Sequence, residues 1–362
     1  MPQTSREQVE NVLRGLIDPH LNQDPLSAGC VQDIRIDQNS VEVDVRLGYA
    51  ADQFKSGWAQ MLQMQLEQLD GVSDAKVTVD WAVPAQAGMA GPDVLSQVKN
   101  VIAVASGKGG VGKSTTAANL ALALAREGAK VGVLDADIYG PSQGIMFGVA
   151  PGTRPGVKDE KFFVPVEAMG VKVMSMAFLT DDETPMVWRG PMASGALLQM
   201  LTQTAWGELD YLVVDMPPGT GDIQLTLSQK AAVAGALIVT TPQDIALLDA
   251  KKGIEMFRKV NIPVLGVVEN MAMHVCSSCG HIEHIFGEGG GGRLADNYEV
   301  DLLASLPLSM DIRKQCDGGK PTANADPESQ IAMIYQQLAR TVGARLSIAA
   351  HAGTVMPEIQ IG

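Results

Sequence analysis

The residues with the clearest chemical meaning form a glycine-rich stretch that ends in a lysine and hydroxyl side chains. Its members are Gly107, Lys108, Gly109, Gly110, Val111, Gly112, Lys113, Ser114 and Thr115. Glycine lets consecutive backbone N–H groups turn toward a polyanion, and the start of a following helix adds partial positive charge. In such a loop, Lys113 is expected to reach the β- and γ-phosphates of a nucleotide, and Ser114 to bind Mg²⁺. The stretch therefore predicts a nucleoside triphosphate site.

Carboxylates follow two other apolar stretches of the chain. One stretch leads into Asp135 and Asp137, and another, residues 211–214, leads into Asp215. Ligands of parallel sheets bind at the carboxyl ends of strands, so we expect all three carboxylates near the nucleotide. Asp215 matches a Walker B pattern, in which the acid holds the hydration shell of Mg²⁺. The glycines in residues 216–222 can form a switch that closes on the γ-phosphate.

A third chemical feature is the pair Cys276 and Cys279, which is followed directly by a glycine. Two thiolates at this spacing can bind one soft metal site. The pair is compatible with a redox dithiol, with a zinc site completed by His281 and His284, or with part of an iron–sulfur cluster site. The dithiol is the least favoured, because such pairs usually open a helix. A cluster needs four ligands, which a symmetric homodimer would supply by joining two pairs.

Composition limits the class of protein. The chain has 362 residues, enough for two domains, and 46% hydrophobic residues. Its net charge of −14 argues against a surface that coats nucleic acid. No apolar run approaches the roughly 20 residues of a membrane span, and the first residues lack the apolar core of a signal peptide. Four cysteines suit a reducing compartment. We therefore expect a cytoplasmic protein that binds neither nucleic acid nor membrane.

The elements that must position these residues alternate between strand and helix from about residue 98 onward. This order is typical of a mostly parallel sheet covered by helices on both faces. Residues 101–105 are expected as a buried strand before the glycine-rich stretch, and residues 117–124 as the helix after it. Residues 331–346 predict a closing amphipathic helix, whereas the glycines of residues 287–293 indicate a flexible loop.

The N-terminal part predicts a separate, small α/β domain. Apolar residues recur at helical spacing from Val9 to Ile17, and they alternate with charged residues from Val41 to Leu47. The expected order is helix, strand, strand, helix, strand. The expected domain organisation is a small domain at 1–83, a flexible linker at 84–97, the nucleotide-binding domain at 98–350 and a loose tail at 351–362.

The glycine-rich stretch with its extra lysine resembles the deviant Walker A family, which includes MinD, ParA, the arsenite-pump ATPase and the nitrogenase iron protein. The resemblance implies that Lys108 reaches across a homodimer to the partner's nucleotide. It also implies that Asp137 positions the attacking water and that Asn270 reads the adenine edge, so that the nucleotide is ATP. Lys108, Lys113, Asp137 and Asp215 are therefore the expected catalytic residues.

A narrower resemblance covers residues 98–345 and joins several motifs. They are the glycine-rich stretch, Asp-Ala-Asp-Ile-Tyr-Gly-Pro-Ser at 135–142, Trp-Arg-Gly-Pro-Met at 188–192, Asp-Met-Pro-Pro-Gly-Thr-Gly-Asp at 215–222, Glu-Asn-Met at 269–271 and the cysteine pair. This combination is similar to Mrp/ApbC-type iron–sulfur cluster carrier ATPases, and residues 1–83 resemble the iron–sulfur assembly domain often fused ahead of them. Many members have proline after the first cysteine, where this chain has Ser277.

The resemblance implies a slow ATPase that holds a 4Fe–4S cluster between two chains through Cys276 and Cys279. Apoprotein acceptors and scaffold proteins are its expected partners. Two alternatives stay open: a spatial regulator of the ParA or MinD type, and an ATPase with a structural zinc site. The regulator is disfavoured by the net charge and by the absence of lysine and arginine from residues 348–362. Cys30 and Cys316 are interpreted as structural residues.

Overall fold

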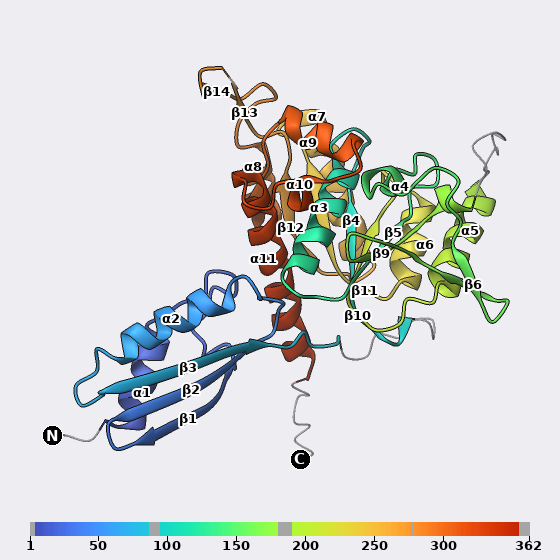
Figure 1. The fold of residues 1–362 in the computed structure, drawn as a ribbon. Coiled ribbons are helices and arrows are strands. Elements are labelled where there is room, and N and C mark those ends of the chain that lie inside the picture. Colours follow the sequence, from blue (N-terminus) through green and yellow to red (C-terminus); the bar gives the residue numbers. More distant parts are fainter. Residues whose placement is uncertain (1–3, 87–94, 180–189, 277, 355–362) are drawn as a thin grey trace, which may run out of the picture. The chain divides into compact units, whose positions relative to one another are not determined.

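The structure is a computed structural model that describes residues 4–86, 95–179, 190–276 and 278–354. Its contacts divide the chain into two units, drawn in Figure 1. Unit 1 comprises Met1–Ala87, Arg126–Gly128 and Arg340–Gly362. Unit 2 comprises Gly88–Ala125 and Ala129–Ala339. Each unit thus combines stretches that are far apart in the sequence.

Unit 1 is built on a three-stranded sheet with strand order β1-β2-β3. Its elements are α1 (Arg6–Arg14), β1 (Val31–Asp37), β2 (Ser40–Leu47), α2 (Lys55–Leu66) and β3 (Asp74–Trp81). β1 pairs with β2 antiparallel, and β2 pairs with β3 parallel. The expected order of helix, strand, strand, helix, strand is confirmed.

The core of unit 1 follows from the alternating pattern of β2. Val41, Val43 and Val45 are buried on the face that packs with the apolar side of α2, which includes Trp58. The same cluster contains Ala344, from the last helix of the chain.

The last helix contributes more to unit 1 than the sequence predicts. Arg340 Nη2 lies 2.6 Å from Glu127 Oε1, and Glu127 Oε2 accepts a hydrogen bond from the backbone of Gln53 at 2.9 Å. Glu127 is fully buried, so its charge requires these partners. Residues 126–128 and 340–350, which sequence analysis assigns to the nucleotide-binding domain, therefore group with unit 1.

Unit 2 is built on an eight-stranded sheet with strand order β15-β12-β11-β4-β10-β5-β9-β8. Its strands are β4 (Val98–Ala105), β5 (Val131–Asp135), β8 (Val166–Ala168), β9 (Val171–Ser175), β10 (Leu209–Asp215), β11 (Val233–Thr240), β12 (Val264–Glu269) and β15 (Leu302–Ser305). All neighbouring pairs are parallel except β8 with β9. Every residue of β5, β10 and β11 is buried, so both faces of the sheet's centre are covered. The expected fold class is confirmed.

Helices and short hairpins complete unit 2. The helices are α3 (Lys113–Arg126), α4 (Gln143–Met146), α5 (Gly190–Gln203), α6 (Asp222–Lys230), α7 (Asp244–Lys259), α8 (Gly290–Tyr298), α9 (Met310–Asp317), α10 (Thr322–Ala325) and the first part of α11 (Gln330–Thr354). The hairpins pair β6 (Gly156–Lys158) with β7 (Phe162–Val164), and β13 (His274–Val275) with β14 (Ile282–Glu283). None of the helices in the described ranges is long and apolar enough to cross a membrane.

Two expectations about local structure were wrong. The glycines expected in a flexible loop at 287–293 include the start of α8, at Gly290. A Cβ on Gly290 would lie 2.5 Å from the carbonyl oxygen of Pro242, so close packing requires glycine there. The closing helix, expected at 331–346, continues to Thr354 and includes residues 351–354, which were expected in a loose tail.

Candidate functional site

The glycine-rich stretch forms a tight loop between β4 and the first residue of α3. Gly110 and Gly112 have φ angles of +81° and +85°, which disfavour any residue with a Cβ. At Gly107 a Cβ would lie 2.2 Å from the backbone of Asp249 in α7, and at Gly112 it would lie 2.0 Å from Asn270 Nδ2. The loop therefore needs glycine both for its turns and for its contacts, and it ends at a helix N-terminus, where backbone N–H groups can bind an anion.

The ammonium group of Lys113 lies among the acidic residues. Lys113 is 6% exposed, and its Nζ donates a hydrogen bond to Oδ1 of the fully buried Asp215. It also lies 3.1 Å from Ser114 Oγ and 3.8 Å from Asp137 Oδ2. The structure thus brings together these four predicted residues, and the ammonium group of the lysine offsets part of the negative charge of the two carboxylates.

Asp135 holds the segment that follows β5. Its Oδ2 accepts hydrogen bonds from the backbone N–H groups of Ser142 at 2.9 Å and Gln143 at 3.0 Å, and from Ser175 Oγ at 3.0 Å. Burial, reinforced by the negative charge of Asp215, raises the pKa of Asp135 to about 7. Asp135 is thus placed to support the site through the backbone.

Asp137, whose Oδ2 lies 3.8 Å from the ammonium group of Lys113, is only partly buried. Burial raises its pKa above the ordinary aspartate value, and the positive charge of Lys113 opposes that rise. A carboxylate in this position can accept a proton from water or orient it by a hydrogen bond.

Gln143 is a site residue that sequence analysis missed. Its side chain is fully buried, and its Nε2 donates to the backbone oxygen of Ser114 at 3.0 Å and to Asp215 Oδ2 at 2.8 Å. The only available signal was its place directly after the motif at 135–142, because glutamine carries no charge and no distinctive spacing.

The loop after Asp215 contacts the start of the glycine-rich stretch. The N–H group of Gly219 donates to the backbone oxygen of Ser106 at 2.9 Å, and Gly219 has a φ of +99°. Buried Gln224, in α6, donates to the backbone oxygen of Pro218 at 2.7 Å. A backbone hydrogen bond therefore connects the two loops directly.

Lys108 and Asn270 lie on this loop and beside it. Ser106 Oγ donates to the backbone oxygen of Lys108 at 2.9 Å, and none of the ion pairs within the described ranges includes the Lys108 ammonium. Asn270 Nδ2 donates to the backbone oxygen of Val111 at 2.9 Å, so its side chain contacts the loop directly.

The cysteine pair lies apart from this network, on the hairpin formed by β13 and β14 (Figure 1). The backbone N–H of Cys276 donates to the backbone oxygen of His281 at 2.9 Å, and the N–H of Gly280 donates to the backbone oxygen of Cys276 at 2.9 Å. Cys276 is half-buried and Cys279 exposed. The backbone N–H groups of Ser278 and then of Cys279 lower the pKa of Cys276, which favours a thiolate.

The two histidines proposed for a zinc site do not gather around the cysteines. His284 Nδ1 lies 2.9 Å from the backbone oxygen of Ala272, and His281 is exposed. Among the residues that the structure describes, no group of three or more His, Cys, Asp or Glu side chains has an arrangement that could hold a metal ion. A complete single-chain zinc site is therefore not formed in this part of the chain.

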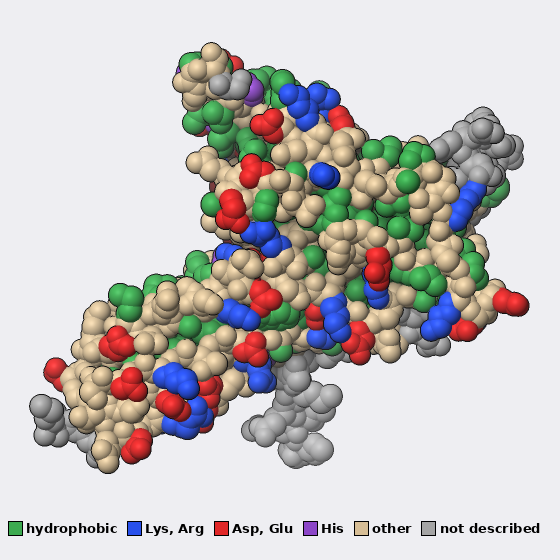
Figure 2. Space-filling model, viewed as in Figure 1, with side chains coloured by type: hydrophobic (Ala, Val, Ile, Leu, Met, Phe, Trp, Pro, Cys, Tyr) green, Lys and Arg blue, Asp and Glu red, His purple; other side chains and the backbone are tan. Residues whose placement is uncertain are grey.

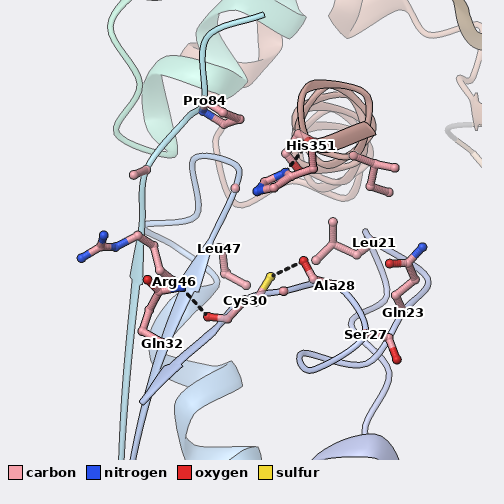
Figure 3. Close-up of a pocket in the computed structure, with 15 residues that line it drawn as sticks. Leu21, Gln23, Ser27, Ala28, Cys30, Gln32, Arg46, Leu47, Pro84 and His351 are labelled. Carbon is pink, nitrogen blue, oxygen red and sulfur yellow. Dashed lines mark hydrogen bonds between the residues drawn. The ribbon is translucent and has the colours of Figure 1, made fainter. Parts of the chain in front are cut away.

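The remaining cysteines are buried, as expected for structural residues. Cys30 lines a cavity of about 480 Å³ in unit 1 (Figure 3), and burial raises its pKa to about 11. Burial also raises the pKa of Cys316, whose Sγ lies 3.9 Å from Asn119 Nδ2. Both thiols are thus disfavoured as thiolate ligands.

Comparison with protein families gives two matches along the chain. Residues 97–343 match the family described as NUBPL iron-transfer P-loop NTPase. Residues 6–79 match the family described as iron-sulfur cluster assembly protein.

Individual proteins are similar over much of the chain. An iron-sulfur cluster carrier protein from Pseudomonas fragi is 72% identical over 286 residues, which is 79% of this chain and 100% of that protein. One from Haemophilus influenzae is 47% identical over 345 residues, covering 94% of this chain and 92% of that protein. A nucleotide-binding protein from Archaeoglobus fulgidus, solved in complex with ADP, is 42% identical with a TM-score of 0.56, covering 63% of this chain and 89% of that one.

Proposed function

The chain belongs to the iron–sulfur cluster carrier family of P-loop NTPases, and we propose that it binds and hydrolyses ATP and carries a cluster to acceptor apoproteins. In this proposal Cys276 and Cys279 bind the cluster as cargo, and the loop from Gly107 to Thr115 binds the nucleotide. The observation that carries the proposal is the cysteine pair, one thiol half-buried and the other exposed, on a hairpin of the unit that contains the nucleotide loop.

The surroundings of the cysteines support a cluster shared by two chains. One pair supplies two of the four ligands that a 4Fe–4S cluster needs, and two-fold symmetry would supply the other two. The aliphatic side chains of Val275, Ile282 and Ile285 are 47%, 52% and 54% exposed on and beside this hairpin, where Figure 2 shows hydrophobic side chains. A second copy would remove these side chains from water.

Exposed apolar residues near the nucleotide loop support the same homodimer. Ile245 and Leu248 of α7 are 72% and 56% exposed, and Asp249, in the same helix, packs against Gly107. Lys108 belongs to this loop, and in the proposed dimer its ammonium group would reach the partner's nucleotide, as in the deviant Walker A family.

The nucleotide site suits Mg²⁺ and phosphate. The glycines leave an open cradle of backbone N–H groups, since a Cβ at Gly109 or Gly110 would meet no atom within 4 Å. The hydroxyl of Ser114 and the carboxylate of Asp215 are oxygen donors of the kind Mg²⁺ prefers. When bound, Mg²⁺ would offset charge that develops on the phosphates.

The residues of this chain would then act in sequence. Lys113 would exchange its ion pair with Asp215 for the β- and γ-phosphates, and Asp215 would then be free to hold the hydration shell of Mg²⁺. Asp137 orients the attacking water and accepts its proton. Gly219 and its loop follow the loss of the γ-phosphate. Asn270, beside the loop, would select adenine, and the ADP bound to the Archaeoglobus fulgidus relative supports an adenine nucleotide.

Anaerobic reconstitution with iron and sulfide tests the proposal. We expect a broad visible absorption band, acid-labile sulfide and about four irons per dimer. Size-exclusion chromatography measures independently whether the reconstituted protein is a dimer. Roughly one zinc per chain without sulfide would overturn the carrier role and leave an ATPase with a structural zinc site. If the protein contained neither iron nor zinc and bound membrane or DNA in a nucleotide-dependent way, it would instead be a spatial regulator.

A further inference from the structure

We propose that Gln143 is a positioning residue that holds the Asp215 carboxylate in the orientation required for Mg²⁺–nucleotide binding. The inference rests on the proposed nucleotide function and adds a residue that no motif of the sequence identifies. Its basis is the buried amide that joins the nucleotide loop to the carboxylate at the end of β10.

The contacts of Gln143 are those of a bridge. Its Nε2 donates at 3.0 Å to the backbone oxygen of Ser114, the residue expected to bind Mg²⁺ from the loop side. The same nitrogen donates at 2.8 Å to Asp215 Oδ2, on the residue expected to hold the hydration shell from the strand side. One amide group therefore sets the separation of the two elements that would surround the metal.

The orientation of the amide follows from its partners. Both atoms that it approaches are acceptors, a carbonyl and a carboxylate oxygen, so the NH₂ group must face them. The side chain is fully buried, and rotation of the amide would place its oxygen against two other oxygens. This arrangement gives Gln143 one stable orientation.

The backbone of Gln143 is held as firmly as its side chain. Its N–H group and that of Ser142 donate to Asp135 Oδ2 at 3.0 Å and 2.9 Å, and Ser175 Oγ donates to the same oxygen at 3.0 Å. Asp135 thus fixes the start of α4, and α4 presents the amide to Asp215. This gives the buried Asp135 a role at the site without contact with the nucleotide.

The two oxygens of Asp215 have different partners, and this difference gives Gln143 its role. Oδ1 is bound by Lys113, which leaves for the phosphates when nucleotide binds, whereas Oδ2 is bound by Gln143. After the exchange, the hydrogen bond from Gln143 would keep the Asp215 carboxylate in place, and Asp215 would be available to hold water bound to Mg²⁺. Without the amide, Asp215 would lose its directional partner at the moment when it must receive the metal.

The amide oxygen of Gln143 also supports a role at the metal site. Oε1 is buried and has no hydrogen-bond partner within the described part of the chain. A buried carbonyl without a partner is unfavourable, and a water of the Mg²⁺ shell would satisfy it. Binding of Mg²⁺–nucleotide would thus give the Gln143 carbonyl a hydrogen-bond partner.

The test is a nucleotide titration on the full chain with Gln143→Leu, which keeps the volume and removes both hydrogen bonds. A fluorescent ADP analogue is titrated first in EDTA and then at increasing Mg²⁺. We expect affinity in EDTA within about twofold of wild type, and about a tenfold higher half-saturating Mg²⁺ concentration, as for one lost hydrogen bond to a charged group. Gln143→Asn, which retracts the amide by one methylene, should give a smaller shift in the same direction.

The matched control is Gln336→Leu, because Gln336 also donates from Nε2 to a backbone oxygen, that of Pro327 at 3.1 Å. It should leave both titrations unchanged. A Gln143→Leu chain with wild-type Mg²⁺ dependence would overturn the inference, as would equal weakening in EDTA and in Mg²⁺. If wild type itself binds no nucleotide, the proposed function fails instead. Should Gln143→Leu not fold, as judged by circular dichroism, Gln143→Asn decides.

Discussion

The nucleotide loop and the cysteine hairpin are two functional regions built in opposite ways. Lys113 and Asp215 are 6% and 0% exposed. Hydrogen bonds among α3, β10 and α4 hold them in place. Cys276 is half-buried and Cys279 exposed, on a hairpin of two short strands. The first region is organised within one chain before any ligand arrives. The second presents two thiols at or near the surface, and in the proposed carrier role it would need further ligands from a second chain.

The contrast has a physical reason. Buried charges must be paired before a ligand comes, because an isolated carboxylate inside a protein is costly. Thiols on an exposed hairpin have little free-energy cost of desolvation, so they need no partner within the chain before they bind a metal. The same chain can therefore combine a buried, internally paired loop with an exposed hairpin, for which we propose cargo binding.

Removal of the loop lysine should have the largest effect. In the part of the chain that the structure describes, Lys113 is the only cationic residue that forms an ion pair with Asp137 or Asp215. Lys113→Ala should therefore lower the free energy of unfolding by about 3–5 kcal/mol. Nucleotide affinity should fall at least about 100-fold in a fluorescence titration. Lys113→Gln, which keeps a donor for Asp215, should fold better yet bind nucleotide equally poorly. Retained affinity in a folded variant would remove the assignment of the loop.

Removal of one hairpin thiol should abolish cargo binding and leave the other region intact. Cys276→Ala should contain no cluster after reconstitution, while its unfolding free energy stays within about 1 kcal/mol of wild type because the side chain is only half-buried. ADP affinity should be unchanged. The matched control is Cys316→Ala, a buried cysteine, which should keep the cluster and lose stability. A cluster in Cys276→Ala would make Cys30 or Cys316 a candidate ligand.

Lys108→Ala separates the contribution of one chain from that of the dimer. Because Lys108 would act on the partner's nucleotide, ADP affinity should change by no more than about twofold, while ATP turnover should fall about 10³-fold. Phosphate release measured beside the ADP titration gives both numbers. Normal turnover in this variant would contradict the role of Lys108 across the dimer.

The smallest effect is expected in unit 1, where a buried histidine responds to pH. Burial lowers the pKa of His20 to about 4 from its ordinary 6.5; Arg340 adds to the shift and Asp18 opposes it. Between pH 6.5 and about 4, His20 is therefore protonated in the unfolded chain but stays neutral in the folded chain. Stability should fall by up to about 3 kcal/mol as pH drops from 6.5 to 4.

His20→Phe should remove this dependence, because phenylalanine does not titrate and the site already packs Tyr49 and Phe54 against the imidazole. Urea unfolding of both proteins at several pH values measures it. An equal loss of stability in wild type and variant between pH 6.5 and 4 would show that other groups cause the dependence.

Local patterns predicted the parts of the fold that depend on neighbouring residues. The strand before the glycine-rich stretch and the alternation from Val41 to Val45 lie where expected, because periodicity records which faces must be buried. The start of α8 at Gly290 was missed, since glycines disfavour helices locally. Packing against Pro242 and a hydrogen bond from the Gly291 N–H to Glu269 Oε1 override that preference.

The chain's sequence alone determined that a phosphate-binding loop, strand-end carboxylates and a closely spaced cysteine pair occur together, because these depend on residue type and short spacing. Only the tertiary structure decided that Gln143 joins Ser114 to Asp215, that the His284 ring contacts the backbone oxygen of Ala272 and that His281 is exposed. Such contacts join residues far apart in the chain. Their geometry depends on how β5, β10 and α3 pack, and no local pattern records that packing.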